Sequence, residues 1–444
     1  MKRNPAHALQ TLALRAAALG MFLDGFDLSI MAIALLPLRT AFALSPAMVG
    51  NLMASALIGS LLGGLLGGSL IDRFGRRALL LPNIALYALG ALGSAFSPNI
   101  TVLIASRFVI GLAVGMDYPL VATVVAEYSD DTERGKGFAG INIAWYGGAL
   151  ASTLVGLALL SAGALSWRLM LGVAVLPALV LLWLRRLIPE SPRWLMRRGD
   201  EKAARQALAQ LHPDWSEETL TNTLTSFQAT PKRWSTLFSK SRRRSLLLSL
   251  IPWTCLDIVG LGIGLYFPTV LRMQGLARTD QTAAAINAVF LLISTAGILF
   301  VLPRLDRLGR IPLQIAGFGL MTAGLLLFAL GIPLTEPALV YAGAALYSLG
   351  TGIGPGVTAM ALSVEIFPTE FRASAGGLAT AVSRLGAAFS AILFPRWEAR
   401  LGLSAMLLIM GAVSLIGAWI THVYALESAG RSLEAIERET DLTH

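Results

Sequence analysis

Long apolar segments separated by short polar loops run along almost the whole chain. Each segment is close to the roughly 20 residues that an α-helix needs to cross a lipid bilayer. Ten-residue stretches of alternating hydrophobicity, the pattern of a transmembrane β-barrel, are absent from the sequence. The pattern therefore predicts an all-α membrane protein with twelve spanning helices, at residues 15–38, 47–70, 78–97, 101–128, 137–162, 168–188, 245–271, 282–303, 311–332, 337–362, 374–396 and 403–426.

The composition agrees with a membrane protein and excludes a soluble one. Hydrophobic residues make up 55% of the 444 positions and charged residues only 14%, whereas soluble domains carry about 25% charged residues. The net charge of +9 comes from short loops between apolar segments, so it indicates membrane topology and not a nucleic-acid partner. The single cysteine, Cys255, excludes a disulfide framework and a cysteine metal cluster, and no cofactor is expected.

The distribution of basic residues predicts the orientation in the membrane. Alternate loops place 27 of the 35 Lys and Arg residues on the side of the N-terminus and 6 on the other side, while Arg107 and Arg384 lie within spans. By the positive-inside rule both termini face the cytoplasm. We expect a six-helix half at 1–188, a cytoplasmic linker with short helices at 189–244, a second half at 245–426 and a cytoplasmic tail at 427–444.

The two halves repeat each other. The loop Asp72-Arg73-Phe74-Gly75-Arg76 follows the second span, and Asp306-Arg307-Leu308-Gly309-Arg310 follows the eighth, 234 residues later. Two further pairs share nearly the same offset: Glu127 with Arg134 against Glu365 with Arg372, and Asp24 against Asp257. Tandem halves of six helices are a layout of secondary transporters.

These loops resemble signature motifs of the major facilitator superfamily. The stretch from Gly68 to Arg77 is similar to the loop between its second and third helices. Pro189-Glu190-Ser191-Pro192-Arg193 and Glu365-Ile-Phe-Pro-Thr-Glu-Phe-Arg372 are similar to motifs of its sugar-porter-type branch. The resemblance implies two packed six-helix halves and a set of gating residues, namely Gly68, Asp72, Arg73, Gly75, Arg76, Glu127, Arg134, Glu190, Arg193, Asp306, Arg307, Arg310, Glu365 and Arg372. We expect the glycine at position 68 to let two helices approach and Asp72 to cap the following helix.

Three shorter stretches resemble aromatic-acid and phosphate proton symporters. They are Asp24-Gly-Phe-Asp27, Gly115-Met-Asp117-Tyr118-Pro-Leu120 and Trp253-x-x-x-Asp257. In those relatives the matching Asp, Tyr and Trp residues line the path of substrate and proton. A glutamine and a tyrosine of phosphate symporters fall at Trp145 and Leu261 here, and the helix-seven amides of hexose porters are missing, so phosphate and hexose are both disfavoured.

Charged residues inside the spans are candidate functional groups, because each costs at least about 2.5 kcal/mol to insert. Asp24 and Asp27 are three residues apart and share a helix face. Both cannot comfortably stay ionised in a dry site, so one is expected to take up a proton unless a cation is close. At about 1.5 Å per residue, Asp27 lies about 18 Å and Arg107 about 32 Å from the cytoplasmic ends of their spans, so only helix tilt and the long arginine side chain would let them pair. We therefore expect Asp27, Asp24 and Arg107 to couple transport to protons; the alternative is a structural ion pair.

A second set of residues is expected to bind substrate. Its members are Asp117, Tyr118, Trp145, Trp253, Asp257 and Arg384. Arg384 could hold a substrate carboxylate or pair with a nearby acid. The alternatives for the others are plain packing of the aromatic residues, and a simple helix kink where Asp117 precedes Tyr118-Pro119.

These features favour a proton-coupled symporter, not an enzyme, that imports a small polar metabolite, with an organic anion as the main hypothesis. The alternatives are a proton-driven antiporter that exports a metabolite, metallophore or drug, and a sugar or phosphate proton symporter. No nucleotide-binding motif of an ATP-driven pump is present in the sequence. The expected partners are the substrate, protons and the lipid bilayer of a bacterial inner membrane, and we expect a monomer.

Overall fold

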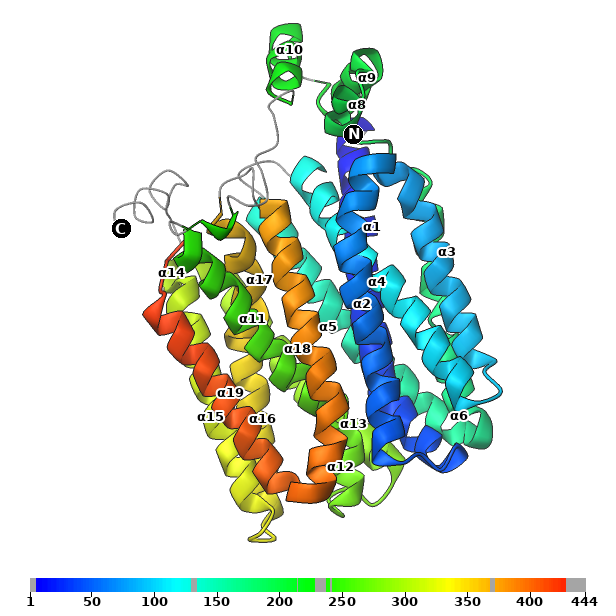
Figure 1. The fold of residues 1–444 in the computed structure, drawn as a ribbon, viewed down its shortest axis with the longest axis vertical. Helices are drawn as coiled ribbons and strands as arrows, with labels where there is room; N and C mark the ends of the chain where they lie inside the picture. Colours follow the sequence, from blue (N-terminus) through cyan, green and yellow to red (C-terminus); the bar gives the residue numbers. More distant parts are fainter. Residues whose placement is uncertain are drawn as a thin grey trace.

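The computed structural model describes residues 5–128, 134–213, 215–227, 237–239, 242–367 and 372–428. Within these ranges the regular elements are all helices, gathered in one elongated bundle (Figure 1). The first helix begins, and the last helix ends, at the same end of the bundle, where the linker helices also lie. We call this the linker end and the opposite end the distal end.

The N-terminal half holds six passes. Four passes are single helices, the fifth reverses at a 3₁₀ turn that contains Gly163 (φ 61°), and the sixth is built from two short helices. The elements are α1 (Pro5–Ala41), α2 (Pro46–Phe74), α3 (Arg76–Ala95), α4 (Ile100–Tyr128), α5 (Arg134–Leu159), η1 (Leu160–Leu165), α6 (Ser166–Gly172) and α7 (Val175–Arg185).

The C-terminal half holds the other six. Its elements are α11 (Arg243–Gly264), α12 (Phe267–Met273), α13 (Asp280–Val301), η4 (Leu302–Arg304), α14 (Leu305–Leu308), α15 (Arg310–Gly331), α16 (Pro337–Ile353), α17 (Pro355–Glu365), α18 (Arg372–Leu401) and α19 (Leu403–Val423).

Besides the sixth span, 168–188, two spans that we expected to be continuous, 245–271 and 337–362, are broken in the structure. The second break lies at Gly354, whose φ of −117° and ψ of −113° are not helical, and Pro355 then opens α17. The first break separates α11 from α12, which has a proline in its first turn. Proline lacks a backbone N–H and suits the first turn of a new helix, so each break occurs where the sequence supplies one.

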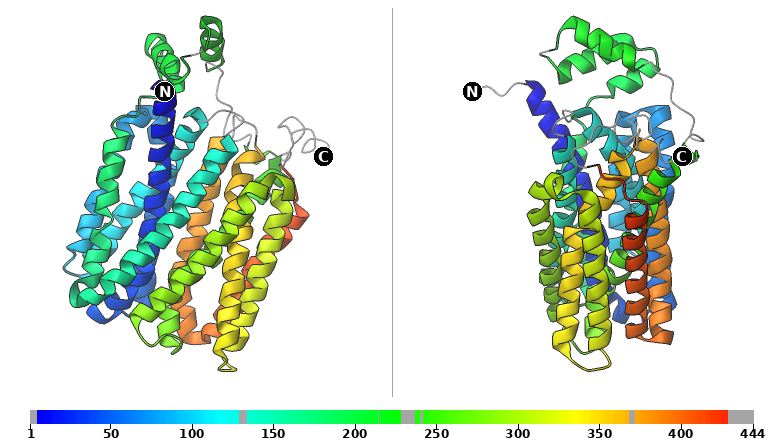
Figure 2. Two further views of the ribbon diagram at one scale, coloured as in Figure 1. Left: turned by 180° about the vertical axis from the view of Figure 1, so that it is seen from behind. Right: turned by 90° about the vertical axis from the view of Figure 1, so that its left-hand side faces the viewer.

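Ten helical stretches among the described residues are long and apolar enough to cross a membrane. One of them, Gly140–Arg185, contains two passes, and α16 and α17 together make one further pass. The structure therefore has the twelve-helix, two-half architecture that the apolar pattern predicts. The halves meet along α2 with α18 and along α5 with α13 (Figures 1 and 2).

The linker forms a small helical layer against the linker end of α1 (Figure 2). It contains α8 (Pro192–Arg197), α9 (Glu201–Leu211) and α10 (Glu217–Ser226). The sequence predicts a short helix from Asp200 to Leu211, and α9 fills this range with Asp200 as its N-cap. Gln10 Nε2 of α1 donates to the carbonyl of Leu211 (3.3 Å), which fixes the linker to the first membrane helix.

Glycines bring α2 and α4 into backbone contact. A Cβ at Gly111 would lie 2.0 Å from the carbonyl oxygen of Ala56, and one at Gly115 would lie 2.0 Å from that of Ser60. Lipid chains are as apolar as the helices, so close packing of small residues is a main source of attraction between membrane helices. The N-terminal half therefore depends on these glycines for its helix spacing.

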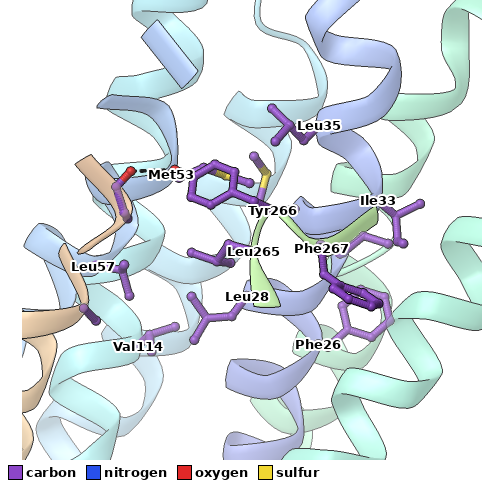
Figure 3. Close-up of a cluster of buried hydrophobic side chains, with 14 of the residues drawn as sticks. Phe26, Leu28, Ile33, Leu35, Met53, Leu57, Val114, Leu265, Tyr266 and Phe267 are labelled. Atoms are coloured by element: carbon purple, nitrogen blue, oxygen red, sulfur yellow. Dashed lines mark hydrogen bonds between the residues drawn. The ribbon is translucent and has the colours of Figure 1, made fainter. Parts of the chain in front are cut away.

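The distal end between the halves is closed by apolar side chains. Leu28 of α1 and Leu57 of α2 lie beside Leu265 of the C-terminal half, Met53 of α2 lies beside Tyr266, and Phe267 lies with Phe26 and Ile33 of α1 (Figure 3).

Two hydrogen bonds between the halves reinforce this seal. Arg39 Nη1 donates to Met273 Sδ (2.9 Å), and Arg396 Nη2 donates to Asn51 Oδ1 (3.2 Å). The halves are thus docked on each other at the distal end.

We predict that Gly115→Val destabilises the protein by about 2 kcal/mol or more, because the added side chain must push α2 away from α4. Denaturation of the detergent-purified protein measures the change. The matched control is Gly319→Ala on α15, where a Cβ would meet no atom within 4 Å. Equal stability of Gly115→Val and wild type would contradict the close packing of α2 on α4.

Candidate functional site

A cavity lies between the two halves at mid-depth. Its volume is about 1410 Å³ when the part open to solvent is included. Both halves supply polar and aromatic side chains to its wall: Tyr118, Asn142, Trp145 and Tyr146 from the first, and Trp253, Asp257, Asn287, Tyr347 and Arg384 from the second. A cavity at the interface of two six-helix halves, lined by both of them, is the usual site of a transported molecule.

The guanidinium of Arg384 joins the two halves across this cavity. Its Nη1 donates to Asp257 Oδ2 (3.1 Å), and its Nη2 lies 3.6 Å from Asp24 Oδ2 and donates to the hydroxyl of Tyr118. Asp24 Oδ2 also accepts from Tyr118 Oη (2.5 Å) and Trp145 Nε1 (2.9 Å). We call Arg384, Asp24 and Asp257 the central bridge: one cation held between two carboxylates of opposite halves.

A second ion pair lies within the N-terminal half. Arg107 donates from Nη1 to Asp27 Oδ1 (2.6 Å) and from Nη2 to Asp27 Oδ2 (2.7 Å). Both residues are 2% exposed, and neither lines the central cavity. The pairing that helix tilt and a long side chain left open is therefore present, as a bidentate contact away from the substrate space.

Asp117 does not face the central cavity, so our expectation that it binds substrate is corrected. Its Oδ1 accepts from Asn83 Nδ2 (3.1 Å) and from Arg185 Nη2, inside the N-terminal half. Neighbouring residues on a helix point about 100° apart. Because Tyr118 faces the cavity, Asp117 turns into the core of its own half.

Arg185 was missed in the sequence. It directly precedes the basic linker, so it was counted among the charges that set topology. In the structure it ends α7, is 3% exposed and pairs with Asp117. Its only sequence signal is its position at the last turn of an apolar segment.

The aromatic candidates line the cavity with neighbours that the sequence did not single out. Trp145 packs edge-on against Tyr146, with ring centroids 5.0 Å apart. Trp253 is 8% exposed and also packs on small residues of α17 and α18. Asn142, Asn287 and Tyr347 complete the polar wall. Uncharged polar residues are common inside helix bundles, so no sequence pattern separates these from packing residues.

The loops expected to gate the transporter carry a matched pair of helix caps. Gly75 (φ 85°) precedes α3, and Gly309 (φ 82°) precedes α15. Glu190 accepts from the backbone N–H groups of residues 76 (3.0 Å) and 77 (3.1 Å). Glu427 accepts in the same way from residues 310 and 311, both at 3.0 Å. A carboxylate at a helix N-terminus is favourable because it complements the helix dipole.

The described cap of α3 is Glu190. The side chain of Asp72, which we expected to cap this helix, lies outside the described part. Glu427, which we placed at the start of a tail, is the equivalent cap of α15. The signal for it was Leu426-Glu427-Ser428, which lies 237 residues after Pro189-Glu190-Ser191.

Arg310 is the centre of an ionic cluster at the linker end of the C-terminal half. Its guanidinium binds Glu365 (3.0 and 3.2 Å) and Asp306 (2.6 Å), and Ser428 Oγ also donates to Glu365 (2.6 Å). These contacts tie together α14, α15, α17 and the segment after α19.

The remaining gating candidates have different surroundings. Arg73 and Arg193 are exposed and lie over the rings of Phe74 and Phe227, and Arg307 is exposed. A Cβ at Gly68 would meet no atom within 4 Å, so the close helix approach that we expected there is absent. A Cβ at Gly67 would lie 3.1 Å from Met116 Cα, so the close approach to α4 is at Gly67. The side chains of Glu127, Arg134 and Arg372 lie outside the described part.

Among the described side chains, no cluster of three or more His, Cys, Asp or Glu residues is arranged to hold a metal ion. The described site consists of ion pairs, amides, hydroxyls and aromatic rings, which suit reversible binding of a small molecule.

Comparison with known proteins supports this interpretation. Residues 13–440 match the family described as "Sugar (and other) transporter". The chain is 31% identical over 418 residues to the inner membrane metabolite transport protein YgcS of Escherichia coli (strain K12), covering 93% of this chain and 90% of that protein. It is 28% identical over 433 residues to a D-xylose transporter of Levilactobacillus brevis, covering 95% and 93%.

The fold is similar to a solved structure of the xylose transporter XylE from Escherichia coli in a partially occluded, inward-open conformation. The TM-score is 0.82 at 23% identity, and the match covers 96% of this chain and 100% of that one. Together with the twelve-helix fold and the central cavity, these matches show that the chain belongs to the sugar (and other) transporter family of the major facilitator superfamily, and that it is a multi-pass membrane transporter and not an enzyme.

Proposed function

We propose that the protein is a proton-coupled symporter that imports a small organic anion through the central cavity. The observation that carries this proposal is the central bridge, in which one guanidinium is shared by two carboxylates. With both acids ionised the bridge has a formal charge of −1. A monoanionic substrate that binds Arg384 would make it −2, and one proton on a carboxylate restores −1. Proton uptake therefore compensates the charge of the substrate.

Asp24 is the carboxylate of the bridge best placed to take that proton. Its Oδ2 is 3.6 Å from Arg384, a weaker contact than the 3.1 Å hydrogen bond to Asp257. Protonation would remove its attraction for the guanidinium, which then becomes available to a substrate carboxylate. Guanidinium groups favour such planar, two-oxygen ligands.

The Asp27–Arg107 pair is proposed as a second proton site on the same helix. A bidentate ion pair with both partners buried is stable only while both are charged. A proton on Asp27 would release Arg107 and loosen α1 from α4. Movement of α1 changes the wall of the cavity, and this links proton binding to the rocking of the halves.

We further propose that the linker end faces the cytoplasm of a bacterial cell and that the distal end faces outward. The basic loops support this orientation by the positive-inside rule. The relative from Escherichia coli is named an inner membrane protein. The distal seal then closes the cavity toward the outside.

A neutral sugar is a second candidate substrate. Asn142 and Asn287 can bind hydroxyl groups, and Trp145 and Trp253 offer faces on which a ring can stack. One relative is named a D-xylose transporter. A sugar would bind beside the central bridge and would not displace Asp24 from Arg384.

In proteoliposomes with an imposed pH gradient, we predict that wild-type protein accumulates one of a panel of benzoate, gluconate, inorganic phosphate and D-xylose. Asp24→Asn and Asp27→Asn should abolish accumulation but retain counterflow exchange, because a neutral amide mimics the protonated acid. Uptake of radiolabelled substrate measures both the accumulation and the counterflow exchange. Accumulation that persists in both variants, or that ignores the pH gradient in wild type, would contradict proton coupling at these residues.

Arg384→Gln is predicted to raise the half-saturating concentration of an organic anion by about tenfold to 100-fold, because hydrogen bonds to charged groups contribute about 1.5–3 kcal/mol. Arg384→Lys should give a half-saturating concentration between those of wild type and Arg384→Gln, because lysine keeps the charge and loses the planar fork. The matched control is Arg400→Gln at the exposed distal end of α18. Anion transport that is unchanged by Arg384→Gln would refute the anion site and favour the neutral sugar.

A further inference from the structure

A second, smaller cavity lies inside the N-terminal half, behind Asp24. Helices α1, α3, α4 and α7 enclose it, and its wall includes Gly20, Asp24, Asn83, Tyr87, Asp117 and Arg185. The centre of a water molecule can move within about 20 Å³ of it. One buried water needs roughly 10–15 Å³ by this measure, so the space suits a single water molecule. We call it the rear chamber.

Four buried polar atoms on residues that line the rear chamber have no protein partner. They are Asp24 Oδ1, Asn83 Oδ1, Tyr87 Oη and Arg185 Nη1. Buried polar groups are hydrogen-bonded in native proteins, and where protein partners are missing an ordered water supplies them. A water with two to four such neighbours is bound firmly. The rear chamber therefore has the donors and acceptors of a built water site.

Asp24 has a different environment on each of its two oxygens. Oδ2 receives the hydrogen bonds of Tyr118 and Trp145 at the central cavity, while Oδ1 is one of the four unpartnered atoms. Asp24 therefore lines the rear chamber and is joined to the central cavity through Tyr118 and Trp145, which line that cavity. A proton bound from one side can leave toward the other.

The C-terminal half joins the equivalent three helices without charges, about one helical turn nearer to the linker end. On its equivalent helices α15, α17 and α19, Gln314 donates to Thr421 Oγ1 (2.9 Å) and accepts from Thr358 Oγ1 (2.7 Å). This neutral triad joins three helices. The N-terminal half joins α3, α4 and α7 with an amide, Asp117 and Arg185. Buried ion pairs are often no more stabilising than neutral packing, so the charges need another explanation.

We propose that the rear chamber is a proton-exchange site, in which a bound water carries a proton between Asp24 and Asp117. Asp24 gives its proton to the water, and the water gives one of its protons to Asp117, so that one proton changes carboxylate and the water is regenerated. Arg185 stays protonated throughout and holds Asp117 in place. The inference rests on the proposed function in one respect, that Asp24 takes up a proton.

The position of the rear chamber gives the proton a route separate from the substrate. Asn83 lies seven residues from the start of α3, about 10 Å from the linker end. A proton that leaves through the chamber does not cross the central cavity. The charged and titratable groups around the two carboxylates are Asp27 on α1, Tyr87 on α3, Arg107 and Tyr118 on α4, Arg185 on α7, Asp257 on α11 and Arg384 on α18.

Trp145 reports on Asp24 without a substrate, because its indole N–H donates to Asp24 Oδ2. A pH jump on the linker side of proteoliposomes, followed by stopped-flow fluorescence, measures how fast Asp24 responds. The difference between each protein and its Trp145→Phe counterpart isolates this signal. Asp117→Asn is expected to slow the response by about tenfold or more, a modest share of what positioned acid–base groups contribute.

A second variant keeps the test valid if Asp117→Asn folds poorly. The double substitution Asp117→Thr with Arg185→Thr replaces the buried ion pair with two hydroxyl groups, as in the neutral triad of the C-terminal half. It leaves no unpaired charge. It should fold and show the same slow response. The matched control, Thr358→Val in the neutral triad, should respond at the wild-type rate.

Two results would overturn the proposal. A wild-type rate in the folded double variant would show that the charges serve packing only, and it would leave proton uptake by Asp24 intact. A complete lack of Trp145 response in wild type would show that Asp24 does not take up a proton, which removes the rear chamber's role together with that part of the proposed function.

Discussion

A shared guanidinium at the centre of the bundle links the two halves. Arg384 comes from the C-terminal half and is held by Asp257 of its own half and Asp24 of the other. It is 4% exposed, so its charge must be balanced by these neighbours. Because the two acids belong to bodies that move relative to each other, the charge state of the bridge and the docking of the halves are linked.

The other buried charges show that the bridge differs in having a surplus carboxylate. At mid-depth the described chain has four aspartates and three arginines. Asp27 with Arg107 and Asp117 with Arg185 form closed pairs within the N-terminal half. The bridge alone has two acids for one cation. An uncompensated charge in the membrane is costly, so the surplus carboxylate is the natural acceptor of a proton or partner of a cation.

The spans and the two-half layout could be predicted from the sequence because hydropathy, loop charge and internal repeats are local signals. The site could be predicted in part. Charged residues within apolar spans are costly and therefore conspicuous, so Asp24, Asp257 and Arg384 were recognised as candidate functional groups. The sequence does not show which way a side chain points around the helix axis. Asp117 was therefore placed on the cavity side of α4, whereas its side chain faces the core of its own half.

Other differences have equally specific causes. Arg185 directly precedes a basic linker in the sequence, so its charge looks like one of the linker charges that set topology. The break at Gly354 depends on tertiary packing that a hydropathy profile does not contain. Asn142 and Tyr347 became cavity residues only when two distant segments were brought together. The cap made by Glu427 could have been found, because it repeats the surroundings of Glu190.

The most direct test is the distance between the halves as a function of pH. Spin labels at Thr40→Cys on α1 and Arg400→Cys on α18, in a Cys255→Ala background, would report the distal end by double electron–electron resonance. In the wild-type background, lowering the pH should increase the population with separated distal ends, and Asp24→Asn should show that population at every pH. The same pH dependence in both backgrounds would contradict control of the halves by the charge of Asp24.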